Sequence, residues 1–183
     1  MRTSISLLLL LLVSIGEARA QTSDDPVFGD SQMFASIQKD LVTAEGLQLL
    51  KTQRLAASKY VILYFSAEWC PGCVSFTPKL VEFYKQNQDQ PFDVIFVSND
   101  KSEEEMLAHM KRSEMSWPGL RYLSFSRLNV GKKYCGKWIP RLVVLDEVGN
   151  IMLQSEASGV DTGPANLLEE FKRKAFRKPK RNT

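Results

Sequence analysis

The chain has little of the residue types that define several specialised protein classes. Its 183 residues include only 3 cysteines, which excludes a small domain held together by many disulfides. Ten glycines and 8 prolines are too few for a collagen-like or low-complexity chain. The net charge of +3 is too small to indicate a nucleic-acid-binding protein, and we expect no nucleic-acid partner. After the first 20 residues, no apolar run is long enough to span a bilayer.

The remaining composition is ordinary for a globular protein. Hydrophobic residues make up 44% of the chain and charged residues 25%. That is enough apolar material to oppose the loss of backbone entropy, so disorder is excluded for most of the chain. The length favours one domain.

Residues 1–20 have the pattern of a secretory signal peptide. Arg2 precedes an apolar run from Ile5 to Ile15, and Ala18-Arg19-Ala20 has the small residues of a cleavage site. The run is about half the roughly 20 residues of a spanning helix, which favours a leader over a membrane anchor. We expect cleavage after Ala20 and an exported chain, periplasmic or secreted, without a transmembrane segment. Residues 21–39 would form an N-terminal extension.

The end of the chain is strongly basic. Residues 172–183 contain seven basic side chains and no acidic one: Lys172, Arg173, Lys174, Arg177, Lys178, Lys180 and Arg181. The pattern is typical of a helix end that continues into a solvated tail, because positive charge suits the C-terminal helix dipole. It would also suit contact with an anionic surface, a polyanion or an acidic partner.

The middle of the chain alternates patterns of strands and helices. Continuous apolar runs predict buried strands at Tyr60–Phe65, Asp93–Val97 and Arg141–Leu145, and a turn at 146–150 leads into a fourth strand, Ile151–Gln154. Helical spacing predicts helices around Phe76–Tyr84, over Ser102–Arg112 and from Gly163-Pro164 onward, and Leu41–Leu50 would form a short hairpin. This order predicts an α/β domain with parallel strands joined by helices.

The candidate chemistry lies in the segment Trp69-Cys70-Pro71-Gly72-Cys73, between a predicted strand and a predicted helix. Free N–H groups and the positive dipole end of a helix stabilise a thiolate, so Cys70 is the expected exposed nucleophile of low pKa. Cys73 follows one turn later, more buried, where it can attack a mixed disulfide formed at Cys70. Pro71 suits the first helical turn.

Other uses of the cysteines are less well supported. Cys70, Cys73, Cys135 and His109 could total four zinc ligands, but there is no second closely spaced pair, and His109 lies in a helix that we expect to be exposed. Covalent haem needs a histidine where Val74 stands. A purely structural Cys70–Cys73 disulfide would close too small a loop to stabilise the fold much. We expect no metal and no cofactor.

The segment Tyr64–Cys73, followed by Phe76–Leu80, resembles the active-site segment of the thioredoxin superfamily. In detail it is similar to the nucleoredoxin/tryparedoxin-like branch, which includes exported bacterial members. Three further stretches match in order: Leu41–Gly46, Phe92–Asp100 and Trp138–Leu142. The resemblance covers residues 40–171 and implies a thioredoxin-like fold, with a central mixed sheet flanked by helices and an N-terminal β extension.

The resemblance also implies roles for individual residues. Cys70 would attack and Cys73 would resolve, with Pro71 and Gly72 between them and Trp69 shielding the pair. Pro78 would kink the first helix. Ile139-Pro140 would form a cis-proline loop that faces the disulfide, leaving a backbone edge for an extended substrate segment.

Some positions depart from the thioredoxin pattern or stay open. The buried aspartate that accepts the proton of the resolving cysteine in thioredoxins corresponds to Tyr64, and its associated lysine to Phe96. Water, Glu68 or the Tyr64 hydroxyl are the candidates to replace it. Cys135 is expected to be a small buried hydrophobe, with an auxiliary thiol as the alternative. Trp117-Pro118-Gly119 could form a loop beside the site.

The implied function is an exported thiol–disulfide oxidoreductase that acts on protein disulfides together with an unidentified redox partner. A thiol peroxidase is disfavoured because it uses a single cysteine in a peroxide-binding environment. The non-enzymatic alternative is a thioredoxin-like binding domain with a structural disulfide and a basic tail that docks onto a polyanion. The sequence does not distinguish a reductase from an oxidase.

Overall fold

The computed structural model describes residues 37–49, 53–124, 133–157, 160–161 and 163–176. The expected signal peptide 1–20, most of the extension 21–39 and the end of the basic segment, residues 177–183, lie outside the described residues. Within the described part, no helix is both long enough and apolar enough to cross a membrane.

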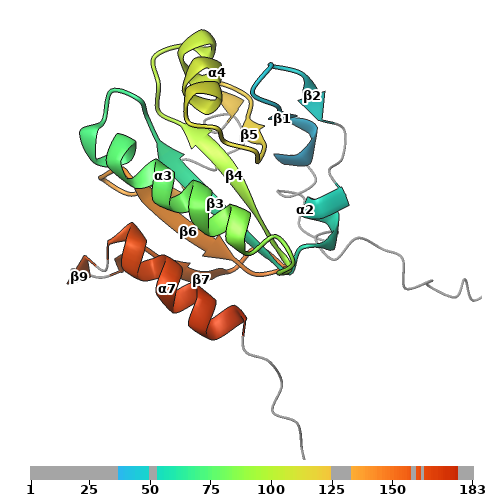
Figure 1. Ribbon diagram of the computed structural model, residues 1–183, viewed down its shortest axis with the longest axis vertical. Coiled ribbons are helices and arrows are strands. Elements are labelled where there is room, and N and C mark those ends of the chain that lie inside the picture. Colours follow the sequence, from blue (N-terminus) through green and yellow to red (C-terminus); the bar gives the residue numbers. More distant parts are fainter. Residues whose placement is uncertain (1–36, 50–52, 125–132, 158–159, 162, 177–183) are drawn as a thin grey trace, which may run out of the picture.

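A mixed seven-stranded sheet in the order β2-β1-β5-β4-β3-β6-β7 forms the centre of the fold (Figure 1). Its strands are β1 Leu41–Val42, β2 Gln48–Leu49, β3 Tyr60–Ser66, β4 Phe92–Ser98, β5 Gly119–Leu120, β6 Arg141–Leu145 and β7 Ile151–Gln154. The neighbours β3, β4 and β5 are parallel, whereas β6 runs antiparallel to β3 and β7 antiparallel to β6. The predicted strands and the predicted hairpin of β1 with β2 are confirmed.

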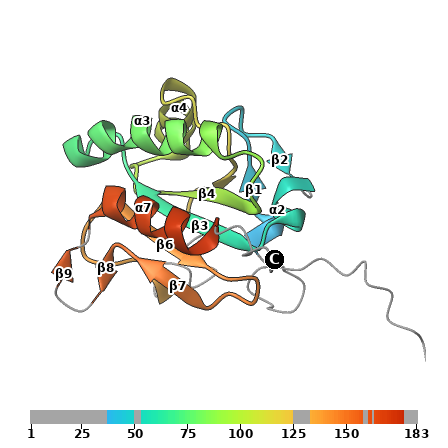
Figure 2. The same cartoon turned by 60° about the horizontal axis from the view of Figure 1, so that its bottom comes forward.

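The helices are α2 Gln53–Ala57, α3 Pro71–Gln86, α4 Glu103–Arg112 and α7 Pro164–Ala175, and a separate hairpin pairs β8 Glu156–Ala157 with β9 Val160–Asp161. Figures 1 and 2 show α3 and α7 on the same face of the sheet. As predicted, Ser102 caps α4 by accepting a hydrogen bond from the Glu105 amide at 3.2 Å. Pro164 stands in the first turn of α7.

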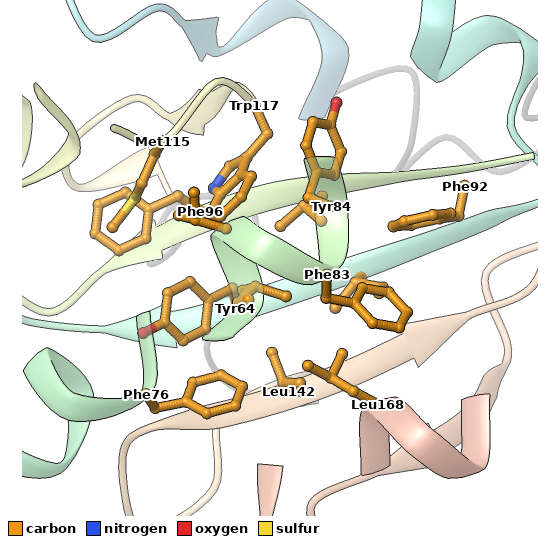
Figure 3. Close-up of a cluster of buried hydrophobic side chains, with 14 of the residues drawn as sticks. Tyr64, Phe76, Phe83, Tyr84, Phe92, Phe96, Met115, Trp117, Leu142 and Leu168 are labelled. Atoms are coloured by element: carbon orange, nitrogen blue, oxygen red, sulfur yellow. The ribbon is translucent and has the colours of Figure 1, made fainter. Parts of the chain in front are cut away.

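Two hydrophobic clusters lie on opposite faces of the sheet, because alternate residues of β3 point to opposite sides. Ile62 and Tyr64 belong to the cluster beneath α3 and α7, and Leu63 and Phe65 belong to the other. In Figure 3, Tyr64 and Phe76 lie together in the first cluster, and their ring centroids are 5.8 Å apart. The central strand is therefore buried on both faces, as its continuous apolar run predicted.

The folded unit extends past both expected boundaries of 40 and 171. Ile37 is buried in the cluster with Leu63. At the other end, α7 continues to Ala175, and Phe176 stacks on Phe83 with ring centroids 6.1 Å apart. Residues 172–176 of the basic segment thus belong to a helix and its capping contact.

The expectation for Trp117-Pro118-Gly119 is wrong. Trp117 is buried with its ring 5.2 Å from that of Tyr84, near the end of α3, whereas Cys70 lies at the start of that helix. A helix of 16 residues is about 24 Å long, so the Trp117 ring lies far from the thiol pair, and Gly119 is a strand residue that pairs with Phe96. The segment leads into β5, a two-residue strand that no pattern in the sequence indicated.

Candidate active site

The two thiols lie at the connection between β3 and the start of α3. Cys70 is the N-cap residue of α3 with extended backbone, and Pro71 occupies the first helical turn, as predicted. The Cys73 amide donates to Cys70 Sγ at 3.3 Å and also to the Cys70 carbonyl at 3.0 Å, so an N–H of the first helical turn points toward the sulfur of Cys70. Cys70 is 8% exposed and Cys73 is not exposed. Cys73 is the more buried of the two, as predicted, but the expectation that Cys70 is exposed is wrong, because the segment before β6 also covers Cys70.

The cover over Cys70 comes from the segment before β6. The Ile139-Pro140 peptide bond is cis, as the resemblance implied. The Cys70 thiol donates to the Ile139 carbonyl at 3.6 Å. A Cβ on Gly72 would lie 3.4 Å from Pro140 Cδ, so the Pro-Gly turn and the proline ring are in near contact. The antiparallel register that pairs Phe65 with Arg141 brings these distant segments together.

Two exposed indoles lie beside the contact of the thiol pair with the cis-proline segment. Trp69 is 56% exposed, and its Nε1 donates to the Asn99 carbonyl at 3.0 Å. Trp138, directly before Ile139, is 74% exposed. Neither side chain belongs to the core, so both offer apolar surface beside the thiol pair and the cis proline.

Asp100 anchors the turn that leads into the thiol pair. Its Oδ1 accepts from the Glu68 amide at 2.7 Å, and its Oδ2 accepts from Ser98 Oγ at 2.7 Å. The same Oδ2 lies 3.2 Å from His109 Nδ1. Burial by itself would raise the pKa of Asp100, but the hydrogen bonds from His109, the Glu68 amide and Ser98 outweigh it, so the pKa lies below its ordinary value.

The expectation that His109 is exposed is wrong, because its side chain is only 2% exposed. It stands three residues after Met106 and next to Met110, on the apolar face of α4. Through Asp100, His109 is connected to the turn that leads into the thiol pair. The described residues contain no group of three or more His, Cys, Asp and Glu side chains that could hold a metal ion.

The resolving thiol of Cys73 is fully buried. Burial, and next the Cys70 side chain, raise the pKa of Cys73 to about 12. Tyr64 pairs with Phe96 across β3 and β4, so the two departures from the thioredoxin pattern are direct neighbours. The Glu68 carboxylate forms an ion pair with Arg112 at the surface. Among the candidate proton acceptors, Glu68 is thus engaged elsewhere.

Cys135 is half-buried and packs beside Ile139 against the cluster that includes Phe65. Its thiol donates to the Gly136 carbonyl at 3.5 Å. The prediction of full burial is therefore correct only in part. The side chain lies on the same segment as the cis proline.

Sequence reasoning missed four residues that support the thiols: Ser66, Thr77, Asp100 and His109. Thr77 stands one helical turn after Cys73, and Ser66 shares a strand face with Tyr64, so both spacings carried a signal. The spacing of His109 from Met106 likewise indicated a place on the buried face of α4. The role of Asp100 had no such signal, because two of its three partners, Glu68 and His109, belong to other segments, and only Ser98 is a near neighbour in sequence.

Comparison with known proteins places this geometry in a family. The sequence model of a family described as thioredoxin-like matches residues 58–151, about half of the chain. Nucleoredoxin of Mus musculus is 40% identical over 108 residues, which cover 57% of this chain and 24% of that protein. Tryparedoxin of Trypanosoma brucei brucei is 35% identical over 101 residues, which cover 54% of this chain and 69% of that protein.

A crystal structure of thioredoxin from Wuchereria bancrofti has 35% sequence identity and a TM-score of 0.60, covering 75% of this chain and 96% of that one. The chain spans only 19–28% of the length of the nucleoredoxins that it matches. The matched part contains the strand, the thiol pair, the helix and the cis proline described above. The chain therefore belongs to the thioredoxin-like family, in its nucleoredoxin and tryparedoxin branch.

Proposed function

We propose that the protein is a thiol–disulfide oxidoreductase that acts on protein disulfides through Cys70 and Cys73. The observation that carries this proposal is the arrangement of the two sulfurs. Cys70 Sγ lies at a helix N-terminus beside the Ile139 carbonyl, and Cys73 lies fully buried one turn behind it. An outer thiol stabilised by a helix start, followed by an inner thiol, is the geometry that sequential thiol–disulfide exchange needs.

In the first step, the Cys70 thiolate attacks one sulfur of the substrate disulfide. The substrate S–S bond breaks, a mixed disulfide forms at Cys70, and the other substrate sulfur leaves as a thiolate. In the second step, Cys73 loses its proton and attacks Cys70 Sγ. The mixed disulfide breaks, the Cys70–Cys73 disulfide forms, and the second substrate sulfur takes up a proton. The substrate gains two electrons, and the protein loses two.

A dithiol reductant has to return the pair to its reduced form for a further cycle, and the same exchange in reverse makes the protein an oxidant. The reduction potential of the Cys70–Cys73 pair decides between the two directions. For this two-electron couple, about 30 mV corresponds to a tenfold change in the equilibrium constant. Equilibration with glutathione buffers of graded ratio measures this potential.

Peptide substrates fit the surface around the thiols. The exposed indoles of Trp69 and Trp138 flank the junction of Cys70 with the cis proline, and the Ile139 carbonyl faces the reacting sulfur. An extended segment on either side of a substrate cysteine would find an apolar surface and a backbone edge there. This supports protein disulfides as the substrate class.

Reduction of insulin by dithiothreitol tests the proposal directly. We expect wild-type protein to accelerate insulin precipitation, Cys70→Ser to be inactive, and Cys73→Ser to accumulate a covalent mixed disulfide that mass spectrometry detects. Cys135→Ser is the matched control and should keep the activity. Equal turnover by wild type and Cys70→Ser would defeat the proposal and favour the alternative, a thioredoxin-like binding domain whose thiol pair is structural.

We further propose that the protein is exported, periplasmic or secreted, after cleavage behind Ala20. Support comes from the leader pattern of residues 1–20. The N-terminal sequence of the protein recovered from its native source tests this. A mature terminus at Gln21 is expected, and an intact Met1 would contradict export by this route.

Contact of the basic segment Lys172–Arg181 with an anionic surface is a separate proposal, supported by seven basic side chains without an acidic one. Sedimentation with vesicles of phosphatidylcholine containing phosphatidylserine tests it. A chain that ends after Phe176 keeps the packed part of α7 and is the matched comparison. The shorter chain keeps Lys172, Arg173 and Lys174, so equal binding of both chains would contradict contact through residues 177–181.

A further inference from the structure

The resolving step of the proposed reaction needs a thiolate at a position that disfavours it. Cys73 has no exposure, and burial together with Cys70 raises its pKa to about 12. At the residue where thioredoxins carry a carboxylate stands Tyr64, which is itself fully buried. Some group must therefore stabilise the negative charge at Cys73 Sγ while the sulfur attacks.

The hydroxyls of Tyr64 and Thr77 are both committed elsewhere. Thr77 Oγ1 donates its hydrogen to the Cys73 carbonyl at 2.8 Å. In the 2.7 Å contact between the two hydroxyls, Thr77 therefore accepts and Tyr64 donates. Neither hydroxyl therefore has a hydrogen left to donate to Cys73 Sγ. Burial also raises the pKa of Tyr64 far above its ordinary value, so its hydroxyl stays protonated.

Ser66 is the remaining hydroxyl, and its hydrogen is uncommitted. It is the last residue of β3, two positions after Tyr64, and so on the same face of the strand. Its side chain is completely buried, yet Oγ has no hydrogen-bond partner among the described residues. A buried hydroxyl without a partner costs stability, so its retention asks for a reason.

The position of Ser66 supplies that reason. Its hydroxyl lies close enough to both Cys73 and Tyr64 to lower the pKa of each, against the effect of burial. The Ala67 amide acts on Cys73 in the same direction. A hydroxyl and a backbone N–H at the end of β3 thus lie near the sulfur of the resolving cysteine.

We propose that the Ser66 hydroxyl donates a hydrogen bond to the Cys73 thiolate during the resolving step, with the Ala67 amide as second donor. The inference rests on the proposed thiol–disulfide exchange. Ser66 stays protonated throughout. The proton that Cys73 loses to solvent is balanced by the one that the departing substrate sulfur takes up. In the resting dithiol, the hydroxyl has no charge to bind, which explains why it is unpaired.

A chromogenic aromatic disulfide separates the two steps in one stopped-flow experiment. The first coloured thiolate reports attack by Cys70, and the second reports resolution by Cys73. For Ser66→Ala we expect an unchanged first phase and a second phase slowed about tenfold, with its pH profile moved to higher pH, because hydrogen bonds to charged groups are the strong ones. Ser66→Thr keeps the hydroxyl and should restore the second phase.

Stability separates this role from a merely structural one. Because Ser66→Ala deletes an unpaired buried hydroxyl, we expect its thermal unfolding midpoint to equal or exceed that of the wild type. An unchanged second phase and pH profile in Ser66→Ala would overturn the inference, as would equal slowing of both phases. If Ser66→Thr unfolds at a lower temperature than the wild type, its rates are not a fair comparison. The pH profile of the second phase of Ser66→Ala then decides whether the inference holds. A wild type without any second phase would instead defeat the proposed function.

Discussion

At the scale of single residues, the support of the thiol pair depends on two buried polar groups. Asp100 accepts a hydrogen bond from the Glu68 amide, in the turn before Cys70, and contacts His109 of α4. Thr77 links the Tyr64 hydroxyl to the Cys73 carbonyl. Each group satisfies several partners at once, and a buried network of this kind is stabilising only while every member is paired.

Replacement of Asp100 should make stability depend less on pH. The folded pKa of Asp100 lies below its ordinary value of 3.8, so its contribution is fully present above about pH 4 and is lost as the pH falls through the folded pKa. We expect Asp100→Asn to lower the free energy of unfolding by about 1–3 kcal/mol at pH 7. Urea unfolding from pH 7 down to pH 3 measures this.

The difference between wild type and Asp100→Asn should shrink below pH 4. Glu103→Gln is the control, because its carboxylate stands in the first turn of α4, outside the network around Asp100. A difference that is the same at pH 7 and pH 3 would show that the carboxylate charge of Asp100 does not contribute.

Thr77→Val should deprive the Tyr64 hydroxyl of its acceptor and the Cys73 carbonyl of its side-chain donor. The shapes of the side chains match, so the loss is one of hydrogen bonding, and we expect about 1–3 kcal/mol less stability in urea unfolding. Tyr64→Phe in the same background removes the stranded hydroxyl and should recover part of the loss. Strictly additive effects of the two substitutions would contradict a shared hydrogen-bond chain.

At the scale of elements, α7 extends the aromatic core beyond the expected end of the domain. Phe171 lies at the centre of this end, with ring centroids 5.6 Å from Phe92 and 5.3 Å from Phe176. Phe176 in turn stacks on Phe83 of α3. Aromatic contacts therefore hold the end of α7 against the sheet and against α3.

Phe176→Ala should lower stability by about 1–2 kcal/mol, less than the roughly 3–5 kcal/mol of a fully buried phenylalanine, since Phe176 keeps some exposure. Thermal unfolding measures the change. Lys172→Ala, on the exposed side of the same helix, is the control and should stay within about 0.5 kcal/mol of the wild type. Equal effects of the two substitutions would show that the last residue does not pack.

At the scale of the whole molecule, both hydrophobic clusters share the central strands. Tyr64 and Phe65 are adjacent in β3 but contribute to opposite faces of the sheet. Disruption of one cluster therefore exposes the strand that supports the other. A single domain built in this way unfolds as one unit.

Two optical probes should report the same unfolding transition. Trp117 is buried, whereas Trp69 and Trp138 are exposed, so the fluorescence change on unfolding comes mainly from Trp117. We expect its midpoint in urea to coincide with that of far-ultraviolet circular dichroism, and Trp117→Phe to remove most of the fluorescence change. Midpoints that differ would contradict a single cooperative unit.

Patterns of neighbouring residues predicted most of the elements and the thiol pair. The strands Tyr60–Ser66 and Arg141–Leu145 and the cap at Ser102 follow from spacing within a few residues. The pairing of His109 with Asp100 and the place of Trp117 did not follow. In both cases the deciding partner, Asp100 or Tyr84, is supplied by another part of the chain.

By itself, the sequence determined that the chain has a buried α/β core and a Cys-Pro-Gly-Cys pair at a helix start, because strand and helix periods and N-terminal helix geometry are local properties. Only the tertiary structure decided what surrounds each sulfur. Strand pairing between residues far apart brings Ile139 to Cys70. It also places the Ser66 hydroxyl near Cys73 without a hydrogen-bond partner among the described residues. The low number of cysteines excluded a scaffold built from disulfides. Long-range packing then gave Cys70 a largely covered position beside Ile139 and Cys73 a fully buried one.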